Sequence, residues 1–119
     1  MKKVLIVDDA VFVRIMVKDA LKDGFEVVGE SASAEESIEM YRRLKPDVVT
    51  MDISLSGQLN GIDALKQIKA DHPEAKVIMV SALGDQANIK SSIELGAFDF
   101  IVKPFSKEQL RKKVEMAVQ

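Results

Sequence analysis

The 119-residue chain contains no cysteine and no tryptophan, and aromatic residues make up only 5% of it. The absence of cysteine excludes a disulfide framework, a thiol nucleophile and a cysteine-based zinc site, and it weakly favours a reducing compartment. Basic residues are not in excess either, because 17 Lys and Arg stand against 19 Asp and Glu, a formal net charge of −2. The composition therefore lacks the signature of a nucleic-acid-binding protein, and we expect proteins or small ligands as partners.

The sequence also lacks a long hydrophobic run. Met-Lys-Lys resembles the beginning of a signal peptide, but the apolar run after it spans only Val4 to Val7 before two aspartates. That run is too short for a secretory signal or a membrane span, so we expect a cytoplasmic protein with no membrane partner. The chain has the length of a single domain, and 47% of it is hydrophobic. This is enough to build one core, and we expect one domain over residues 1–119 that is a monomer.

Short β-branched runs alternate with segments of helical periodicity along the whole chain. The expected strands are Val4–Val7, Glu26–Val28, Val48–Met51, Val77–Val80 and Phe100–Val102, and the expected helices span residues 9–23, 33–44, 61–71, 85–95 and 106 to the C-terminus. This alternation predicts an α/β fold with a parallel sheet and crossover helices. Right-handed crossovers favour a doubly wound, five-stranded sheet of order 2-1-3-4-5, the flavodoxin-like arrangement, with five helices.

Local signals mark the ends and faces of these helices. Ser33 with Glu36, and Ser106 with Gln109, have the spacing of a capping box at a helix N-terminus. In the first helix one face is apolar, and the opposite face carries a basic stripe of Arg14, Lys18 and Lys22.

Polar side chains follow four of the five predicted strands at their carboxyl ends. Asp8 and Asp9 follow the first strand, Asp52 the third, Ser81 the fourth and Lys103 the fifth. In a doubly wound sheet these ends line one crevice, so we expect the five side chains to lie close together.

Three carboxylates in one crevice repel one another and need a compensating charge. Oxygen donors without His or Cys suit Mg²⁺, which keeps positions open for phosphate oxygens. Lys103 and the hydroxyl of Ser81 would contact the same phosphate, and an aspartate is a competent nucleophile toward phosphorus. These residues predict phosphoryl chemistry on an aspartate.

Four segments carry a family resemblance: VLIVDDAVFVR at 4–14, KPDVVTMDI at 45–53, VSALGD at 80–85 and FIVKPF at 100–105. Together they resemble the receiver domain of two-component response regulators, most closely the CheY-like single-domain chemotaxis type, over the whole chain. The resemblance implies that Asp52 accepts a phosphoryl group from a sensor histidine kinase. It also implies that Asp8, Asp9, Asp52 and the main-chain carbonyl of Ser54 hold Mg²⁺.

The resemblance further assigns a switch. Ser81 corresponds to the hydroxyl that turns toward the phosphoryl group, Lys103 to the lysine that neutralises it, and Phe100 to the aromatic residue that moves inward in response. The Lys103–Pro104 peptide corresponds to one that is usually cis in the family. The implied partners are the kinase, a phosphatase and an output protein that reads the surface of helix 4, strand 5 and helix 5. In chemotaxis that output protein would be the flagellar motor switch.

Some positions depart from the family pattern. The loop Ser54–Asn60 is one residue longer than in many receivers and lacks proline, so we expect it to be more mobile. Ser54 and Leu83, two residues after Asp52 and Ser81, offer no group to orient an attacking water, so we predict hydrolysis of the phosphoryl bond no faster than in relatives with such groups. Val11 and Phe12 lie off the core stripe of the first helix, and we expect them to be exposed and to contact the phosphodonor or a phosphatase.

Other functions remain possible from the residues alone. A phosphohydrolase with an aspartate nucleophile would use similar chemistry, although the chain lacks its usual DxD motif on the first strand. A carrier of flavin mononucleotide would share the fold, but it needs a phosphate-cradling loop where this chain has two acids. A receiver trimmed from a larger regulator of another pathway is a further alternative. Neither GxGxxG nor GxxxxGK occurs, so dinucleotide and P-loop sites lack support.

Overall fold

The computed structural model describes residues 1–119 as five parallel strands and five helices in strict alternation. The elements are β1 (Lys2–Val7), α1 (Val11–Leu21), β2 (Phe25–Ser31), α2 (Ala34–Leu44), β3 (Val48–Asp52), α3 (Gly61–Asp71), β4 (Val77–Ser81), α4 (Gln86–Glu94), β5 (Asp99–Val102) and α5 (Lys107–Ala117). They form one sheet of order β2-β1-β3-β4-β5, which confirms the predicted fold and strand order. No helix combines the length and the apolar character needed to cross a membrane.

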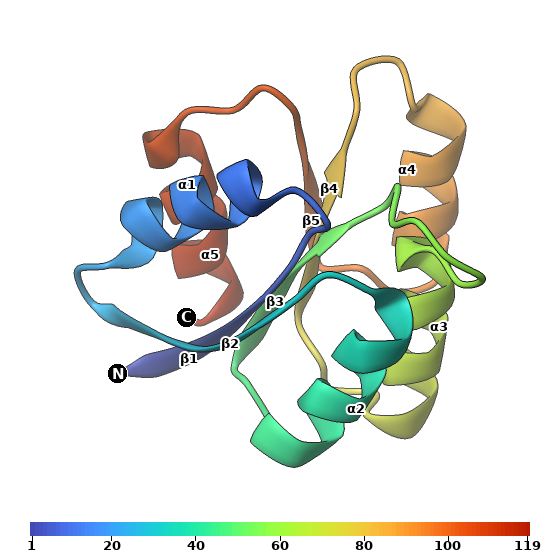
Figure 1. Cartoon of the computed structure of the whole chain (residues 1–119), viewed down its shortest axis with the longest axis horizontal. Helices are drawn as coiled ribbons and strands as arrows, with labels where there is room; N and C mark the ends of the chain where they lie inside the picture. Colours follow the sequence, from blue (N-terminus) through green and yellow to red (C-terminus); the bar gives the residue numbers. More distant parts are fainter.

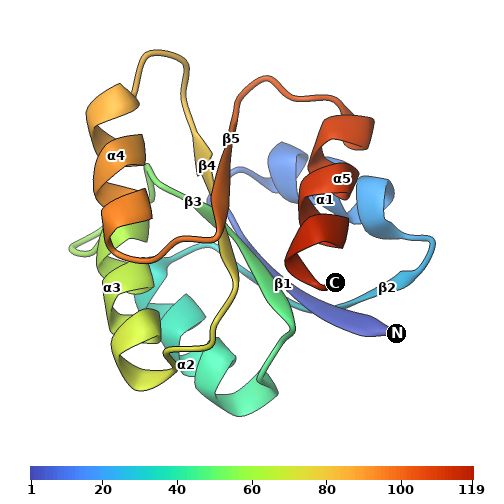
Figure 2. The ribbon, with the colours of Figure 1, turned by 180° about the vertical axis from the view of Figure 1, so that it is seen from behind.

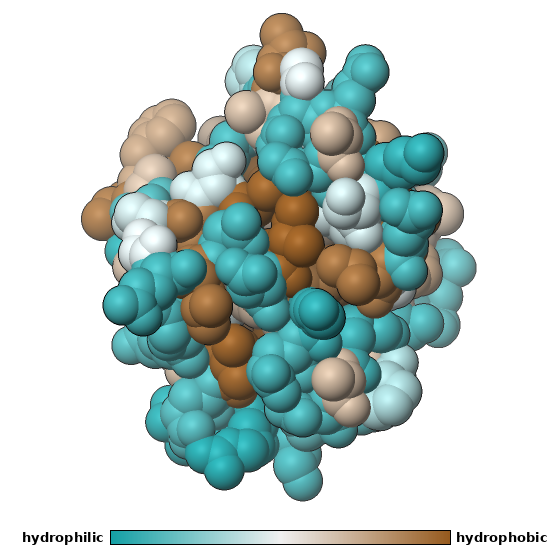
Figure 3. Space-filling view, turned by 90° about the vertical axis from the view of Figure 1, so that its right-hand side faces the viewer, coloured by the Kyte–Doolittle hydropathy of each residue, from teal (hydrophilic) through white to brown (hydrophobic).

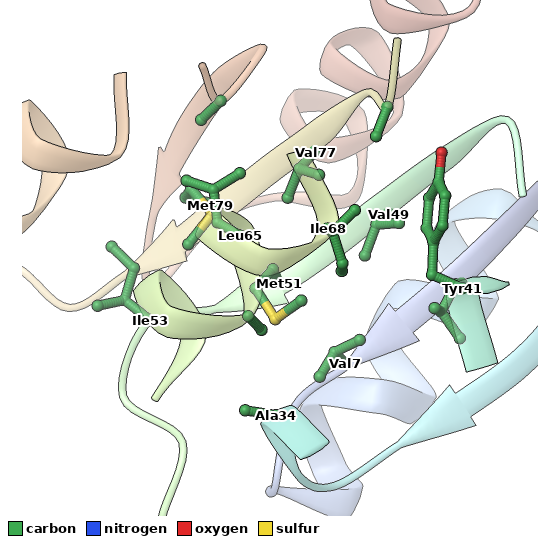
Figure 4. Close-up of a cluster of buried hydrophobic side chains, with 14 of the residues drawn as sticks. Val7, Ala34, Tyr41, Val49, Met51, Ile53, Leu65, Ile68, Val77 and Met79 are labelled. Carbon is green, nitrogen blue, oxygen red and sulfur yellow. The ribbon is translucent and has the colours of Figure 1, made fainter. Parts of the chain in front are cut away.

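Helices cover both faces of the sheet, as Figures 1 and 2 show. α1 and α5 lie together on one face, and α2, α3 and α4 lie on the other. Alternate residues of each central strand therefore enter two separate cores. Leu5 and Val7 pack in the core beneath α2 and α3, part of which is drawn in Figure 4, whereas Val4 and Ile6 pack in the core beneath α1 and α5. Burial on both sides explains why the central strands read as continuous apolar runs.

Several element boundaries differ from the sequence prediction. β2 continues through Ser31 rather than ending at Val28, because the polar residues of this edge strand still pair with β1, with a register shift between Val4 and Leu5. β3 and β4 each extend by one residue, through Asp52 and Ser81. α1 begins at Val11 rather than Asp9. Two candidate site residues, Asp52 and Ser81, are therefore the last residues of β3 and β4.

Side chains cap the N-termini of three helices, α2, α3 and α5. At α5 the predicted capping box of Ser106 and Gln109 is reciprocal, as expected. At α2 only half of the predicted box forms: Ser33 accepts a hydrogen bond from the Glu36 N–H, but the main-chain N–H of Ser33 donates to the hydroxyl of Ser31 instead of to Glu36. The sequence interpretation also missed the reciprocal box of Asn60 and Asp63 at α3.

Candidate functional site

Three aspartates meet at the carboxyl end of the sheet. Asp8 and Asp9 follow β1 directly and Asp52 ends the adjacent strand β3, and one carboxylate oxygen from each lies within 4.8 Å of the others. Asp8 is 2% exposed and Asp52 4%, whereas Asp9 is exposed to solvent. The structure therefore brings together the acid cluster that the sequence predicted, with two of its members buried.

Lys103 supplies the positive charge closest to this cluster. Its ammonium nitrogen lies 3.1 Å from Asp8 Oδ2 and 3.6 Å from Asp52 Oδ2. The main-chain N–H of Lys103 donates to the carbonyl of Ser81, which places the lysine beside the end of β4. The peptide between Lys103 and Pro104 is cis, as the family resemblance implied.

Asp52 has an elevated pKa. Burial is the main cause, and the charges of Asp8 and Asp9 raise it further. A hydrogen bond of 3.0 Å from the Ser54 N–H to Asp52 Oδ1, together with the charge of Lys103, lowers the pKa without cancelling the effect of burial. The folded chain therefore disfavours the ionised form of Asp52.

Ser81 brings a hydroxyl to the same edge of the sheet. The residue is fully buried, and its Oγ has no hydrogen-bond partner in the protein. Oδ2 of Asp8 is buried as well and is balanced only by its ion pair with Lys103. Buried polar atoms normally have partners, so these two atoms point to a site built to receive an additional group.

The β3–α3 loop is held at both ends and in its middle. Leu55 is buried in the core beneath α2 and α3. The Gly61 N–H donates to the carbonyl of Ile53, and a Cβ at Gly61 would lie 2.0 Å from the carbonyl oxygen of Asp52. The Ser56 N–H lies 3.4 Å from Asp9 Oδ2. These contacts hold the loop against the core and beside the acid cluster.

Phe100 stands apart from the acid cluster, on the edge strand β5. The ring is half-buried against the core beneath α2 and α3, and the ammonium nitrogen of Lys113 lies 5.6 Å from its centroid. Lys113 also bonds to Asp99 at 2.9 Å. A hollow of about 380 Å³ opens beside the ring, lined in part by Leu83 and Lys113. Figure 3 shows hydrophobic side chains at the top of the molecule, where the β4–α4 loop lies. In that loop Leu83 is 85% exposed.

On helix α1 the expected exposure of two residues is confirmed, whereas the expected position of Arg14 is wrong. Val11 and Phe12 are exposed, as expected, at 60% and 74%. Arg14, assigned to a basic stripe away from the core, instead folds back and donates to the main-chain carbonyl of Asp8. No periodicity signals this contact, because it depends on where the end of β1 lies relative to α1.

The donor set of the cluster fits a hard divalent cation. It consists of carboxylate oxygens alone, without imidazole or thiolate, and it includes the buried Asp8 Oδ2 that no hydrogen bond satisfies. Mg²⁺ prefers such oxygen donors and needs few of them from the protein, because it retains several waters. The residues present therefore fit Mg²⁺.

Comparison with known proteins shows the family of the chain. The family model of the response regulator receiver domain matches residues 4–115. The chain belongs to this family. It is 54% identical over 105 residues to the chemotaxis protein CheY of Thermotoga maritima, covering 87% of each chain, and 47% identical over the full length of both chains to CheY of Listeria monocytogenes. These relatives indicate a phosphorylation-activated response regulator in chemotaxis, which is a signalling protein.

A solved receiver structure resembles the chain closely. The CheX–CheY–BeF3–Mg²⁺ complex of Borrelia burgdorferi matches with a TM-score of 0.92 at 33% identity, covering 99% of this chain and 90% of that chain. In that complex a receiver of the same fold is bound to another protein, together with Mg²⁺ and BeF3.

Proposed function

We propose that Asp52 is the phosphoacceptor of this receiver and that a histidine kinase of a chemotaxis pathway is the donor. The observation that carries the proposal is the placement of the Asp52 carboxylate: buried at a strand end, beside two other carboxylates and 3.6 Å from the ammonium group of Lys103. A carboxylate oxygen of Asp52 forms a bond to phosphorus while the phosphorus–nitrogen bond of the phosphohistidine breaks and the imidazole leaves with the bonding electron pair. The phosphoryl group adds about −1.5 to −2 of charge.

The neighbouring residues divide the task of balancing that charge. Mg²⁺, held by Asp8, Asp9, Asp52 and the main-chain carbonyl of Ser54, would neutralise phosphoryl oxygens. Lys103 already lies between two carboxylates and contributes the second positive charge. The hydroxyl of Ser81, which has no partner in the protein, is free to donate to a phosphoryl oxygen. The protein acts only on itself here, through phosphorylation and autodephosphorylation of one aspartate.

The same hydroxyl couples the site to the surface. If Ser81 turns toward the phosphoryl group, space opens behind β4, and the half-buried ring of Phe100, on the strand paired with β4, would enter it. That movement withdraws the ring from the ammonium group of Lys113 and changes the surface of α4, β5 and α5. An output protein, the flagellar motor switch in a chemotaxis pathway, would distinguish the two surfaces.

The kinase and a phosphatase are proposed to approach over α1. Phe12 is 74% exposed and borders an apolar hollow of about 400 Å³ whose rim includes Lys103 and Phe105. A partner seated there lies next to the acid cluster. We also propose that the protein is cytoplasmic and monomeric and that residues 1–119 form a single domain.

Incubation with Mg²⁺ and acetyl phosphate, followed by intact-mass measurement, tests the function. The wild type is expected to gain the mass of one phosphoryl group, and Asp52→Asn to gain none. Asp23→Asn, an exposed aspartate after α1, is the matched control and should behave like the wild type. Phosphate retained by Asp52→Asn would overturn the assignment of the phosphoacceptor. Turnover of free phosphoesters would instead favour the phosphohydrolase.

A further inference from the structure

We propose that Arg14 is a positioning residue that orients Asp8 and Asp9 for Mg²⁺ binding; the inference rests on the proposed function. Nη1 of Arg14 lies 2.5 Å from the main-chain carbonyl oxygen of Asp8, and Nε lies 3.2 Å from Glu30 Oε1 on β2. The side chain is only 16% exposed. The guanidinium group therefore links the β1–α1 turn to the neighbouring edge strand, directly behind the acid pair.

The contact falls on the peptide that joins the two acids. The carbonyl of Asp8 and the N–H and Cα of Asp9 belong to one planar unit, so a donor that holds the carbonyl fixes the position of the Asp9 Cα and restricts the directions in which its side chain can leave the backbone. Asp8 has other restraints, since its N–H donates to the carbonyl of Ser31 and its Oδ1 accepts from the Ala10 N–H. Asp9 is exposed, and its carboxylate has only the 3.4 Å contact with the Ser56 N–H. Arg14 is thus a principal restraint on the orientation of Asp9.

The beginning of α1 offers no substitute for this contact. Its N-cap residue is Ala10, which provides no capping side chain, and its first turn contains no acid. Side chains of a helix point back toward its N-terminus, and Arg14, in the first turn, reaches the end of β1 in this way. The arginine therefore ties the start of α1 to the strand that presents the acids.

Two residues hold the guanidinium group in place. Glu30 accepts from Arg14 and, through its other oxygen, lies 2.9 Å from Lys18. Lys18 and then Arg14 lower the pKa of Glu30 against the opposing effect of burial. Lys18 makes the same link between α1 and β2 but does not touch Asp8. A variant at Lys18 therefore distinguishes the positioning role of Arg14 from the general stabilisation that an ion pair provides.

Arg14→Gln is expected to weaken Mg²⁺ binding about tenfold, the lower end of what is typical for residues that orient metal ligands. Lys18→Gln, which loses an ion pair to the same glutamate, should bind Mg²⁺ within about twofold of the wild type. Arg14→Lys keeps the charge but replaces the rigid pair of donors, in which Nη1 meets the carbonyl and Nε meets Glu30, by one ammonium nitrogen on a flexible side chain. It should remain well below the wild type in affinity.

The measurement is isothermal titration with MgCl2 at a temperature where each variant is folded, with the melting temperature recorded beside it. Amide NMR supplies a readout without metal: the Asp9 and Ser56 signals should broaden or shift in Arg14→Gln and not in Lys18→Gln. Equal Mg²⁺ affinity in Arg14→Gln and the wild type would overturn the inference. Full recovery by Arg14→Lys would also overturn it, because charge alone would then suffice. If the wild type bound no Mg²⁺, the proposed function itself would fail.

Discussion

Gly61 packs so closely against Asp52 that a Cβ at the glycine would lie 2.0 Å from the main-chain carbonyl oxygen of the aspartate. The first residue of α3 and the last residue of β3 are thus in direct backbone contact across the longer β3–α3 loop. This contact leaves the end of β3 little freedom, and it couples the loop to the proposed phosphoacceptor.

Gly61→Ala is expected to lower the free energy of unfolding by about 3 kcal/mol, because backbone atoms on both sides must move apart. Phosphorylation by acetyl phosphate should slow as Asp52 shifts. Gly84→Ala is the control: its left-handed φ costs about 1 kcal/mol, but no atom lies within 4 Å of the added methyl group. Urea unfolding followed by circular dichroism measures both. Equal losses in the two variants would show that the close contact carries no cost.

Asp52→Asn should raise stability at neutral pH when Mg²⁺ is absent. Burial and the charges of Asp8 and Asp9 hold the folded-state pKa of Asp52 above its unfolded value, so the ionised carboxylate opposes folding. The gain should appear as a higher Tm of Asp52→Asn than of the wild type in thermal unfolding. Lys103 keeps its ion pair with Asp8 in the variant.

The pH dependence of that gain has a definite sign. A folded-state pKa that is raised makes the wild type relatively more stable below the unfolded pKa, and this advantage is lost as pH rises through the folded pKa. The difference between Asp52→Asn and the wild type should therefore shrink at acid pH, and added Mg²⁺ should shrink it as well. Thermal scans across pH, with the exposed Glu26→Gln as a control, check this. A gain that grows toward acid pH would contradict the assignment.

Lys103→Met should destabilise the chain because it leaves two buried carboxylates without their cation. Breaking a buried pair typically costs about 3–5 kcal/mol, and the partial exposure of Lys103 favours the lower end of that range. Lys107→Met breaks an exposed, solvent-screened pair with Asp19 and should destabilise the chain far less than Lys103→Met. Added Mg²⁺ should restore part of the stability of Lys103→Met and none of that of Lys107→Met. Recovery of neither variant, or of both, would argue against compensation at the acid cluster.

Ser81→Ala is expected to leave the unphosphorylated chain as stable as the wild type or slightly more so, because the lost hydroxyl has no partner. Ser37→Ala provides the contrast. That serine is equally buried, but it donates to the carbonyl of Ala34 at 2.7 Å, and its loss should cost about 1 kcal/mol. Denaturant unfolding compares the two. A large loss in Ser81→Ala would show that the hydroxyl already serves the resting fold.

Leu83→Gln should shorten the lifetime of the phosphorylated state. Leu83 is 85% exposed in the β4–α4 loop, and a carboxamide there could orient a water toward phosphorus where the leucine cannot. Loss of ³²P after removal of the donor gives the rate. Leu83→Ala is the control, because it removes the leucine side chain without adding a polar group, and it should lose phosphate at the rate of the wild type. Equal rates in all three proteins would show that position 83 does not influence hydrolysis.

The sequence was sufficient to predict the fold and the residues of the acid cluster. Continuous apolar runs predicted strands buried on both faces, and the order of the strands follows from connection rules that hold for any such chain. Asp8, Asp9, Asp52 and Lys103 could be placed together because parallel strands present their carboxyl ends at one edge. The motifs that gave the family resemblance are local in sequence, so they could be read without coordinates.

Contacts between elements were decided only by the tertiary structure. Arg14 and Lys18 lie on one helical stripe, yet only Arg14 reaches the Asp8 carbonyl, because the distance depends on how α1 sits over the end of β1. The sequence placed Gly61 at the start of a helix, but not against the Asp52 backbone. It also placed Ser81 at a strand end, but only packing determined that its hydroxyl would lack a partner. Periodicity records which face of an element is apolar, whereas these relationships depend on distances between elements far apart in the chain.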